Sequence, residues 1–463
     1  MKAASPSPVR RGVPVRVVTD DDVGKPAFIV YCIFIVSYFL HLGARVPAIG
    51  AMHADVLLSG LALVLGLTAK KPEGPPGTQV KTPMHRVSKL LLGLIVYIIV
   101  TLPVVRWPGS VVSHGWEPFL KSILFFVLTV VTVTTEKRLK FFLVTFLGVE
   151  LFRVLEPLWL HITTGYWGSF TNMGNWELMD RLSGAPFDIV NPNGLAFVIL
   201  VVITLCHNIL IKGSTKQKIL YFAMLGPVLY AMMLTGSRSG FVALAIFALI
   251  VVWNSKRRAV AIGVLTVACV VLFGSMDDME RQRYLSIVDH SAKGGATAEG
   301  RISGIWDDFD VGMQQPIFGH GLGTSLEANA NARGEALPSH TLFTEVLQEL
   351  GLLGLALFIW FIVEACRNCV IAVRDSKKAG GFLLHAGESV RDFGIVLLFF
   401  SCASYGLNEP QWYLFAALSI VLRDLARKRL QADGAAEPAP PAPAPARRGI
   451  APARGAAARG VLR

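Results

Sequence analysis

The sequence predicts an all-α polytopic membrane protein with about twelve transmembrane helices and a helical loop region outside the membrane. Two observations support this class. Hydrophobic residues make up 53% of the 463 residues and charged residues only 16%, with a mean hydropathy of +0.53. The apolar residues also form runs of bilayer-spanning length, too many and too long for the core of a soluble protein.

The expected spans follow these apolar runs in chain order. They cover approximately residues 27–43, 46–68, 87–106, 117–135, 138–158, 193–211, 216–235, 238–254, 258–275, 340–365, 390–408 and 410–424. Residues 1–26 are basic and lack a cleavage-site pattern, so the first span is expected to remain as an anchor. Residues 433–463 are Pro/Ala-rich and non-periodic, which predicts a disordered tail after a transmembrane domain over 27–432.

Lys and Arg are concentrated in alternate connections between these spans, which predicts that both termini are cytoplasmic. The net charge of +12 follows from this topology, so it does not indicate a nucleic-acid partner. Two outside connections, residues 159–191 and 275–339, are longer than connectors require. The second is expected to form short amphipathic helices over 277–288 and 301–314 and to cap the spans from outside.

The segment "PSHTLFTEVLQELGLLG" places polar side chains on one half of an otherwise apolar helix. At about 100° per residue, Glu345, Gln348 and Glu349 share a face with His340 in the first turn. A charged side chain at membrane depth is costly unless it faces protein or a water-filled cavity. We therefore expect this face to line a cavity. His340 itself is either a helix cap or a neutral base, since a helix N-terminus disfavours its protonation.

Two arginines are expected at the same outer face as His340. Arg238 lies in "LTGSRSGFVAL", a tight turn whose Ser237 and glycines can present backbone N–H groups to an anion, and Arg301 lies in "EGRISGIW". Each arginine alone is also compatible with an ordinary interfacial or solvated position. Because arginine binds phosphate oxygens bidentately, the three residues together predict a reaction on a lipid-linked phosphate.

Four motifs resemble the O-antigen ligase/polymerase superfamily. "PSHTLFTEVLQELGLLG" is similar to its histidine motif, with Thr341 where many members have Asn, and "TGSRSG" resembles its arginine turn. "GRISGIWDDFDVGMQQPIFGHGLGTS" resembles its G-R-x-x-x-W…P-x-x-G-x-G segment, and "NPNGLAF" a further element. The motifs cover about residues 185–360.

The resemblance implies a GT-C-like, inverting, metal-independent glycosyltransferase of the bacterial inner membrane that needs no cofactor. It would transfer polysaccharide from undecaprenyl pyrophosphate to lipid A-core on the periplasmic side, among membrane lipids and without nucleic acid. His340 would activate the acceptor hydroxyl, while Arg238 and Arg301 would hold the donor diphosphate. Six further residues are candidate supporting or cavity-lining residues: Glu345, Glu349, Gln348, Ser237, Asn193 and Arg45.

Several alternatives remain open from the sequence. An O-antigen polymerase or a protein O-oligosaccharyltransferase belongs to the same superfamily, although the latter usually carries a large additional C-terminal region. A transporter or flippase would place polar residues on both sides of the membrane midplane. The acidic run 307–310 is expected to be a solvated helix face rather than a metal site, and Glu150, Arg153 and Glu156 are either functional or mutually paired.

Overall fold

The computed structural model describes residues 24–69, 84–173, 177–188, 190–287, 289, 295–404 and 406–436. The first elements are α1 (Lys25–Phe39), α2 (Leu42–Arg45), α3 (Pro47–Ala51), α4 (Ala54–Thr68), α5 (Arg86–Thr101), α6 (Pro108–Ser110), a π-helical turn (Val111–Gly115), α7 (Trp116–Thr132), α8 (Glu136–Thr164), β1 (Gly168–Asn172) and β2 (Leu178–Leu182). The remaining elements are α9 (Pro192–Ile211), α10 (Thr215–Leu234), α11 (Arg238–Asn254), α12 (Arg258–Ser275), α13 (Asp278–Leu285), α14 (Gly295–Gly312), α15 (Ser325–Arg333), α16 (Leu342–Ala379), α17 (Gly381–Ser401) and α18 (Pro410–Ala436).

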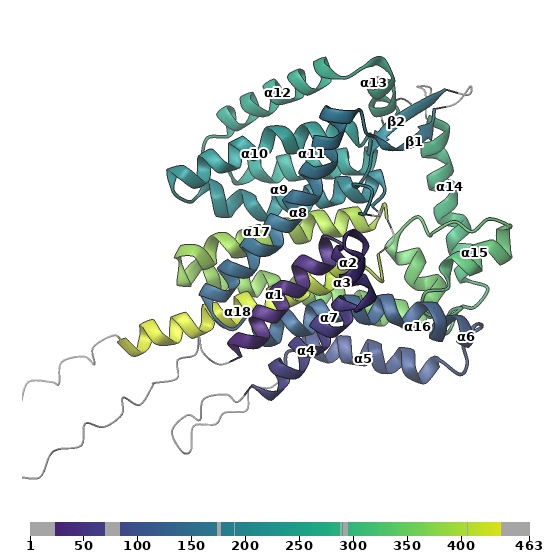
Figure 1. The fold of residues 1–463 in the computed structure, drawn as a ribbon, viewed down its shortest axis with the longest axis horizontal. Coiled ribbons are helices and arrows are strands. Elements are labelled where there is room, and N and C mark those ends of the chain that lie inside the picture. The colour runs from purple at the N-terminus through teal and green to yellow at the C-terminus, as the bar shows by residue number, and fades with distance from the viewer. Residues whose placement is uncertain are drawn as a thin grey trace, which may run out of the picture.

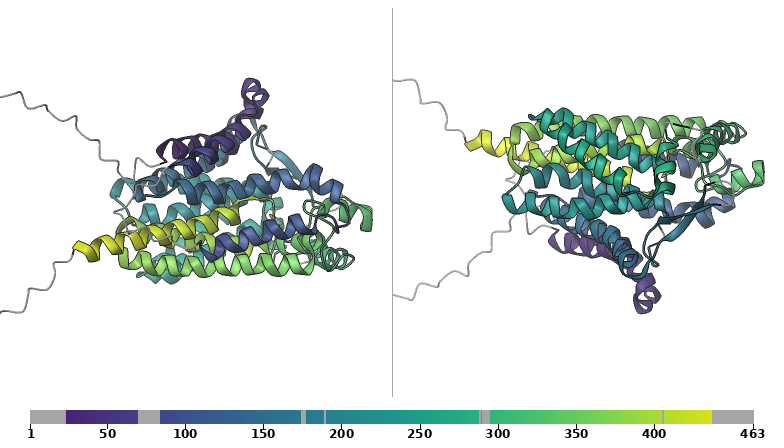
Figure 2. Two further views of the ribbon diagram at one scale, coloured as in Figure 1. Left: turned by 90° about the horizontal axis from the view of Figure 1, so that it is seen from below. Right: turned by 90° about the horizontal axis from the view of Figure 1, so that it is seen from above.

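The long helices form one bundle, and the remaining elements gather at one of its ends. Figures 1 and 2 show β1, β2, α13, α14 and α15 at this end, which we call the capped end. All five elements lie within the two long connections 159–191 and 275–339, so these two connections come together at this end. Helices α13 and α14 were expected, whereas α15 and the antiparallel β1–β2 hairpin, with Gly168 paired to Leu182, were not.

Part of the helical set meets the requirements of a membrane span by length and composition. Four described stretches qualify: Pro108–Thr132, Pro192–Ile211, Thr215–Leu234 and Leu342–Ala379. Four shorter apolar helices cover Lys25–Phe39, Ala54–Thr68, Arg238–Asn254 and Arg258–Gly274. These helices support a membrane protein, while the count of about twelve spans, the GT-C-like assignment and the cytoplasmic termini stay predictions.

Some expected boundaries were wrong. The expected span over 46–68 is broken, because Pro47 starts the short α3 and the positive φ of 47° at His53 interrupts the chain before α4. The last helix extends to residue 436, well beyond the expected end at 424 and into the expected tail. The rest of that tail and residues 1–23 lie outside the described residues.

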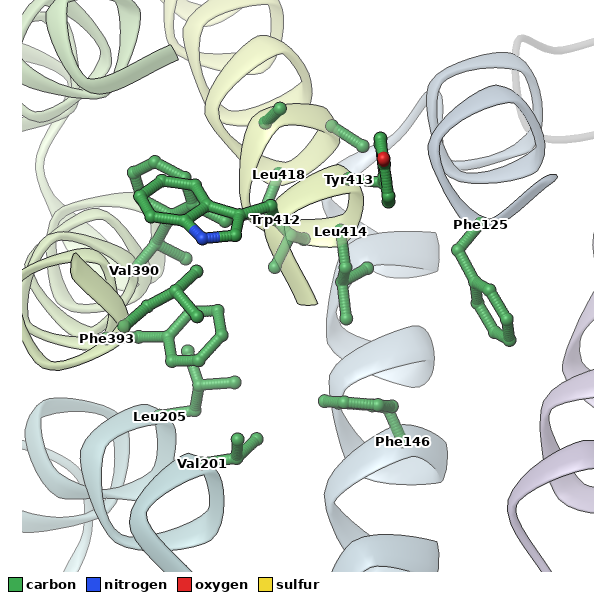
Figure 3. Close-up of a cluster of buried hydrophobic side chains, with 14 of the residues drawn as sticks. Phe125, Phe146, Val201, Leu205, Val390, Phe393, Trp412, Tyr413, Leu414 and Leu418 are labelled. Carbon is green, nitrogen blue, oxygen red and sulfur yellow. The ribbon is translucent and has the colours of Figure 1, made fainter. Parts of the chain in front are cut away.

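Helix α18 lies at the centre of the bundle. Its residues Trp412, Tyr413, Leu414 and Leu418 are all buried, and Figure 3 shows them among apolar side chains of neighbouring helices such as Phe393. A helix that is apolar on all sides is stable only when it is surrounded by other elements. This position fixes the start of α18, which borders the site described below.

Helix α16 contains a sharp kink at Gly351, where φ is 67° and ψ is −174°. The kink frees backbone carbonyls that a continuous helix would use. The Gln348 carbonyl accepts from the His320 N–H at 2.8 Å, and the Glu349 carbonyl from the Gly321 N–H at 3.0 Å. The kink therefore docks residues 316–321 into α16 and separates its polar first turns from its apolar remainder.

We expect Gly351→Ala to lower the free energy of unfolding by about 2 kcal/mol or more. A Cβ there would lie 2.4 Å from the Ile317 carbonyl oxygen, and the positive φ is unfavourable for alanine. Unfolding in detergent micelles measures the change. Gly93→Ala in α5 is the control, since its Cβ meets no atom within 4 Å and should be neutral or slightly stabilising. Equal stability of both variants would contradict a structural role for the kink.

Candidate functional site

A cavity of about 530 Å³ opens among α1, α8, α9, α14, α17 and the segments that precede α16 and α18. Its lining is mixed, with aromatic and aliphatic side chains and a small set of polar ones, as in many ligand sites. The charged or ionisable side chains in the lining are His41, Arg153, Arg301, His340 and Glu409, together with Tyr38. The cavity thus brings together three of the candidate site residues selected from the sequence: His340, Arg301 and Asn193.

His340 is held by Asp308 of α14. One carboxylate oxygen of Asp308 accepts from the His340 backbone N–H at 2.7 Å and lies 2.8 Å from Nδ1. Asp308 is fully buried, whereas the His340 side chain is 21% exposed. Because the carboxylate accepts from Nδ1–H, this geometry assigns the proton to Nδ1 and leaves Nε2 as a proton acceptor.

The expectation that residues 307–310 form a solvated helix face was therefore wrong for Asp308. Arg301, Gly304 and Asp308 are spaced by three and four residues, so they share one face of α14. A Cβ on Gly304 would lie 2.4 Å from the His340 ring, so glycine lets the imidazole pack directly against the helix. Among the described residues, no group of three or more His, Cys, Asp or Glu side chains is arranged to hold a metal ion.

His340 precedes α16 rather than occupying its first turn. The helix begins at Leu342, and the Thr341 side chain caps it by accepting from the Thr344 N–H at 3.1 Å. The expected effect of the helix dipole on His340 is thus replaced by the contact with Asp308. Thr and Asn are both good N-cap residues, which gives a physical reason why Thr341 can stand where related sequences have Asn.

The polar face of α16 packs against protein, which corrects the expectation that it lines the cavity. Glu345 and Glu349 are 5% and 1% exposed, and neither is among the residues described around this cavity. One carboxylate oxygen of Glu345 accepts from the backbone N–H groups of Gly406 and Leu407 at 2.7 and 2.9 Å. Glu345 therefore holds the connection between α17 and α18.

Glu349 and Gln348 hold other parts of the capped end. The Glu349 carboxylate accepts from the Gly323 N–H at 2.7 Å, just before α15. The Gln348 amide donates to the Asp308 backbone carbonyl at 3.1 Å and to Asn329 Oδ1 at 3.0 Å. These two side chains fasten α14 and α15 to α16, and so support the position of His340 indirectly.

Arg238 lies at the start of α11, and two buried arginines that the sequence analysis missed bind its turn. Arg181 of β2 donates from Nε to the Thr235 carbonyl at 2.7 Å, and Arg283 of α13 donates from Nε to the Gly236 carbonyl at 2.6 Å. Both arginines lie in the two long outside connections. No motif singles them out, because their partners are backbone atoms far along the chain.

We call Arg181, Arg238, Arg283 and Arg301 the arginine cluster. Burial, followed by the charges of Arg283, Arg301 and Arg238, lowers the pKa of Arg181 to about 9. Burial, followed by the charges of Arg238 and Arg301, lowers the pKa of Arg283 to about 10. The four guanidinium groups are thus close enough to repel one another, and a bound anion would relieve this repulsion.

Asn193 connects the arginine cluster with the cavity. It lines the cavity, and its Oδ1 accepts from Arg181 Nη2 at 3.0 Å and from the Ser237 hydroxyl at 2.9 Å. Ser237 is buried and also caps α11 by accepting from the Gly240 N–H at 3.2 Å. Both residues therefore support the arginine turn structurally, and Asn193 in addition faces the cavity.

Arg45 lies apart from the arginine cluster. Its guanidinium forms a two-pronged ion pair with Glu156, and it is not among the residues described around the cavity. The remaining charges of α8 are also paired, since Arg153 donates to Glu150 at 2.9 Å and to Asp188 at 2.7 Å. Glu150 and Arg153 are therefore paired with each other, while Glu156 is paired with Arg45 of α2.

Comparison with protein families yields a match. The model of the family described as O-antigen ligase matches residues 219–359, which include Arg238, Arg301, Asp308 and His340. A search of curated proteins finds no significant match. The family match supports a membrane glycosyltransferase-like enzyme that acts on polysaccharide and lipid substrates.

We expect inorganic pyrophosphate to raise the melting temperature of the detergent-solubilised protein by about 2–5 °C at saturating concentration, because it relieves repulsion within the arginine cluster. Arg301→Gln should reduce this shift at least by half. Arg257→Gln, which changes an exposed arginine between α11 and α12, is the matched control and should keep it. Equal shifts for wild type and Arg301→Gln would contradict anion binding by Arg301.

Proposed function

We propose that this chain, a member of the O-antigen ligase/polymerase superfamily by its domain at residues 219–359, is an O-antigen ligase. It would transfer O-antigen polysaccharide from undecaprenyl pyrophosphate to lipid A-core on the periplasmic face of the inner membrane. The observation that carries this proposal is that His340, which is held by the buried Asp308, lines the same cavity as Arg301.

In this mechanism His340 is the general base. Its Nε2 accepts the proton of an acceptor hydroxyl while the hydroxyl oxygen attacks the anomeric carbon of the donor sugar. The bond between that carbon and the pyrophosphate oxygen breaks, and undecaprenyl pyrophosphate leaves with the electron pair. Attack from the side opposite the leaving group inverts the anomeric configuration.

Asp308 and the arginines would stabilise the charges that develop during transfer. The buried Asp308 carboxylate orients the imidazole and stabilises it once Nε2 is protonated. Arg238 and Arg301 would bind the diphosphate, whose negative charge grows as the sugar–oxygen bond breaks. Arg181 and Arg283 hold the turn that carries Arg238 and add to the positive potential there.

We expect His340→Ala to abolish transfer and Asp308→Asn to lower kcat by about 10²- to 10⁴-fold, because the base is lost in one and misoriented in the other. Initial rates with purified protein in vesicles measure both effects. Asp310→Asn is the matched control, since Asp310 lies on the same helix and is exposed. Transfer by His340→Ala at a rate near that of the wild type would rule out His340 as the base.

The proposed reaction is tested by reconstitution with undecaprenyl-pyrophosphate-linked glycan and lipid A-core, with and without EDTA. Glycosylated lipid A-core formed in the presence of EDTA is the expected product of a metal-independent ligase. Growth of the lipid-linked chain without modification of lipid A-core would instead identify the alternative, an O-antigen polymerase. Ligase is preferred because the histidine, arginine-turn and G-R-x-x-x-W motifs together resemble ligases more closely.

A further inference from the structure

The mechanism above leaves one carboxylate of the cavity without a role. Glu409 lies in the connection between α17 and α18, directly before Pro410, which begins α18. Its side chain is exposed and lines the same cavity as His340 and Arg301. A carboxylate that is accessible inside a cavity of ligand size is placed to contact a bound ligand.

The backbone that carries Glu409 is held by contacts from three helices. Glu345 accepts from the N–H groups of Gly406 and Leu407, and the Tyr413 hydroxyl donates to the Leu407 carbonyl at 2.8 Å. The Ser122 hydroxyl donates to the Asn408 carbonyl at 2.5 Å. These contacts come from α16, α18 and α7, so Glu409 projects into the cavity from a preorganised backbone.

The cation that acts on Glu409, Arg153, is already paired with two other carboxylates. Arg153 acts on Glu409 electrostatically, but its guanidinium donates to Glu150 and Asp188. A neutral neighbour, Gln411, hydrogen-bonds to Glu409 and also lines the cavity. The Glu409 carboxylate therefore keeps capacity to accept hydrogen bonds from a ligand.

The charge distribution of the cavity indicates which ligand group fits Glu409. A carboxylate repels phosphate, so the diphosphate belongs with Arg301 and the arginine cluster rather than with Glu409. Sugar hydroxyls are donors that a carboxylate binds strongly. Tyr38, which is half-buried, lines the cavity as well and offers aromatic surface to the apolar face of a sugar ring.

We propose that Glu409 and Gln411 form a sugar-binding subsite in which Glu409 accepts hydrogen bonds from the hydroxyl groups of one residue of the transferred or accepting glycan. The subsite rests on the proposed function and deepens it. Glu409 would determine which sugar is bound next to His340, the proposed base, and Arg301, the proposed diphosphate ligand. Glu345 is its positioning residue. The hydroxyl groups belong to either the donor glycan or the acceptor glycan. The KM values for the two substrates distinguish these possibilities.

The first test measures binding without catalysis. Phosphate-free oligosaccharides, released separately from the donor and from the acceptor lipid, are titrated into the detergent-solubilised protein and followed by tryptophan fluorescence. We expect Glu409→Gln to weaken binding of one oligosaccharide about tenfold and Glu409→Ala to weaken it further, because a charge-assisted hydrogen bond is lost. Glu117→Gln, which alters an exposed carboxylate in the first turn of α7, should leave the affinity unchanged.

The pyrophosphate-induced shift in melting temperature serves as the folding and selectivity control. It should be the same in wild type, Glu409→Gln and Glu409→Ala, because the guanidinium groups of the arginine cluster, and not the Glu409 carboxylate, are expected to bind the anion. Unchanged oligosaccharide affinity in both Glu409 variants, or no oligosaccharide binding by the wild type, would overturn the proposal. If the Glu409 variants lost both the pyrophosphate-induced shift and the binding of oligosaccharide, the proposal would also be overturned. Glu409 would then act on the fold as a whole.

The second test uses steady-state transfer. Glu409→Gln should raise KM about tenfold for the substrate whose sugar occupies the subsite, with a smaller change in kcat. A raised KM for the lipid-linked donor assigns the donor glycan, and a raised KM for lipid A-core assigns the acceptor. If the wild type does not transfer glycan at all, the proposed function fails, whereas oligosaccharide binding that depends on Glu409 would still support the subsite.

Discussion

The buried polar face at the start of α16 is the constraint on which the capped end depends. Glu345 and Glu349 are removed from solvent, and a buried carboxylate is tolerated only where hydrogen-bond donors surround it. Here the donors are backbone N–H groups of the connections before α15 and before α18. The need to satisfy these buried carboxyl groups thus ties two connections to α16, and one of these connections carries Glu409.

The same helix start joins His340, the proposed base, to the rest of the cavity. His340 precedes the Thr341 cap and is bound by Asp308, which Gln348 contacts from about two turns further along α16. The kink at Gly351 then frees carbonyls that hold residues 320 and 321. Because α14 is fastened to α16 in this way, Arg301 on α14 keeps its place beside the arginines of β2, α11 and α13. The proposed reaction needs this geometry, since the base and the diphosphate site come from different elements.

Residues whose role depends on local pattern could be predicted, and residues whose role depends on distant partners could not. The periodicity of α16 indicated correctly that Glu345 and Glu349 avoid lipid, but it did not distinguish a cavity from a protein interior. Asp308 resembled its solvated neighbours in sequence, and only the approach of His340, far along the chain, makes it buried. Arg181 and Arg283 were missed for the same reason, because they bind backbone carbonyls that sequence patterns do not mark.

The sequence by itself determined the membrane class, most of the helix order, the resemblance of its motifs to the O-antigen ligase/polymerase superfamily and the selection of Arg238, Arg301 and His340 as candidates. These follow from composition, hydrophobic run length and motif spacing, which are local properties of the chain. Only the tertiary structure decided that Asp308 orients His340, that Glu345 and Glu349 bind loops and that Glu409 faces the cavity. Each of these depends on contacts between segments far apart in sequence, whose geometry is set by the packing of the whole bundle.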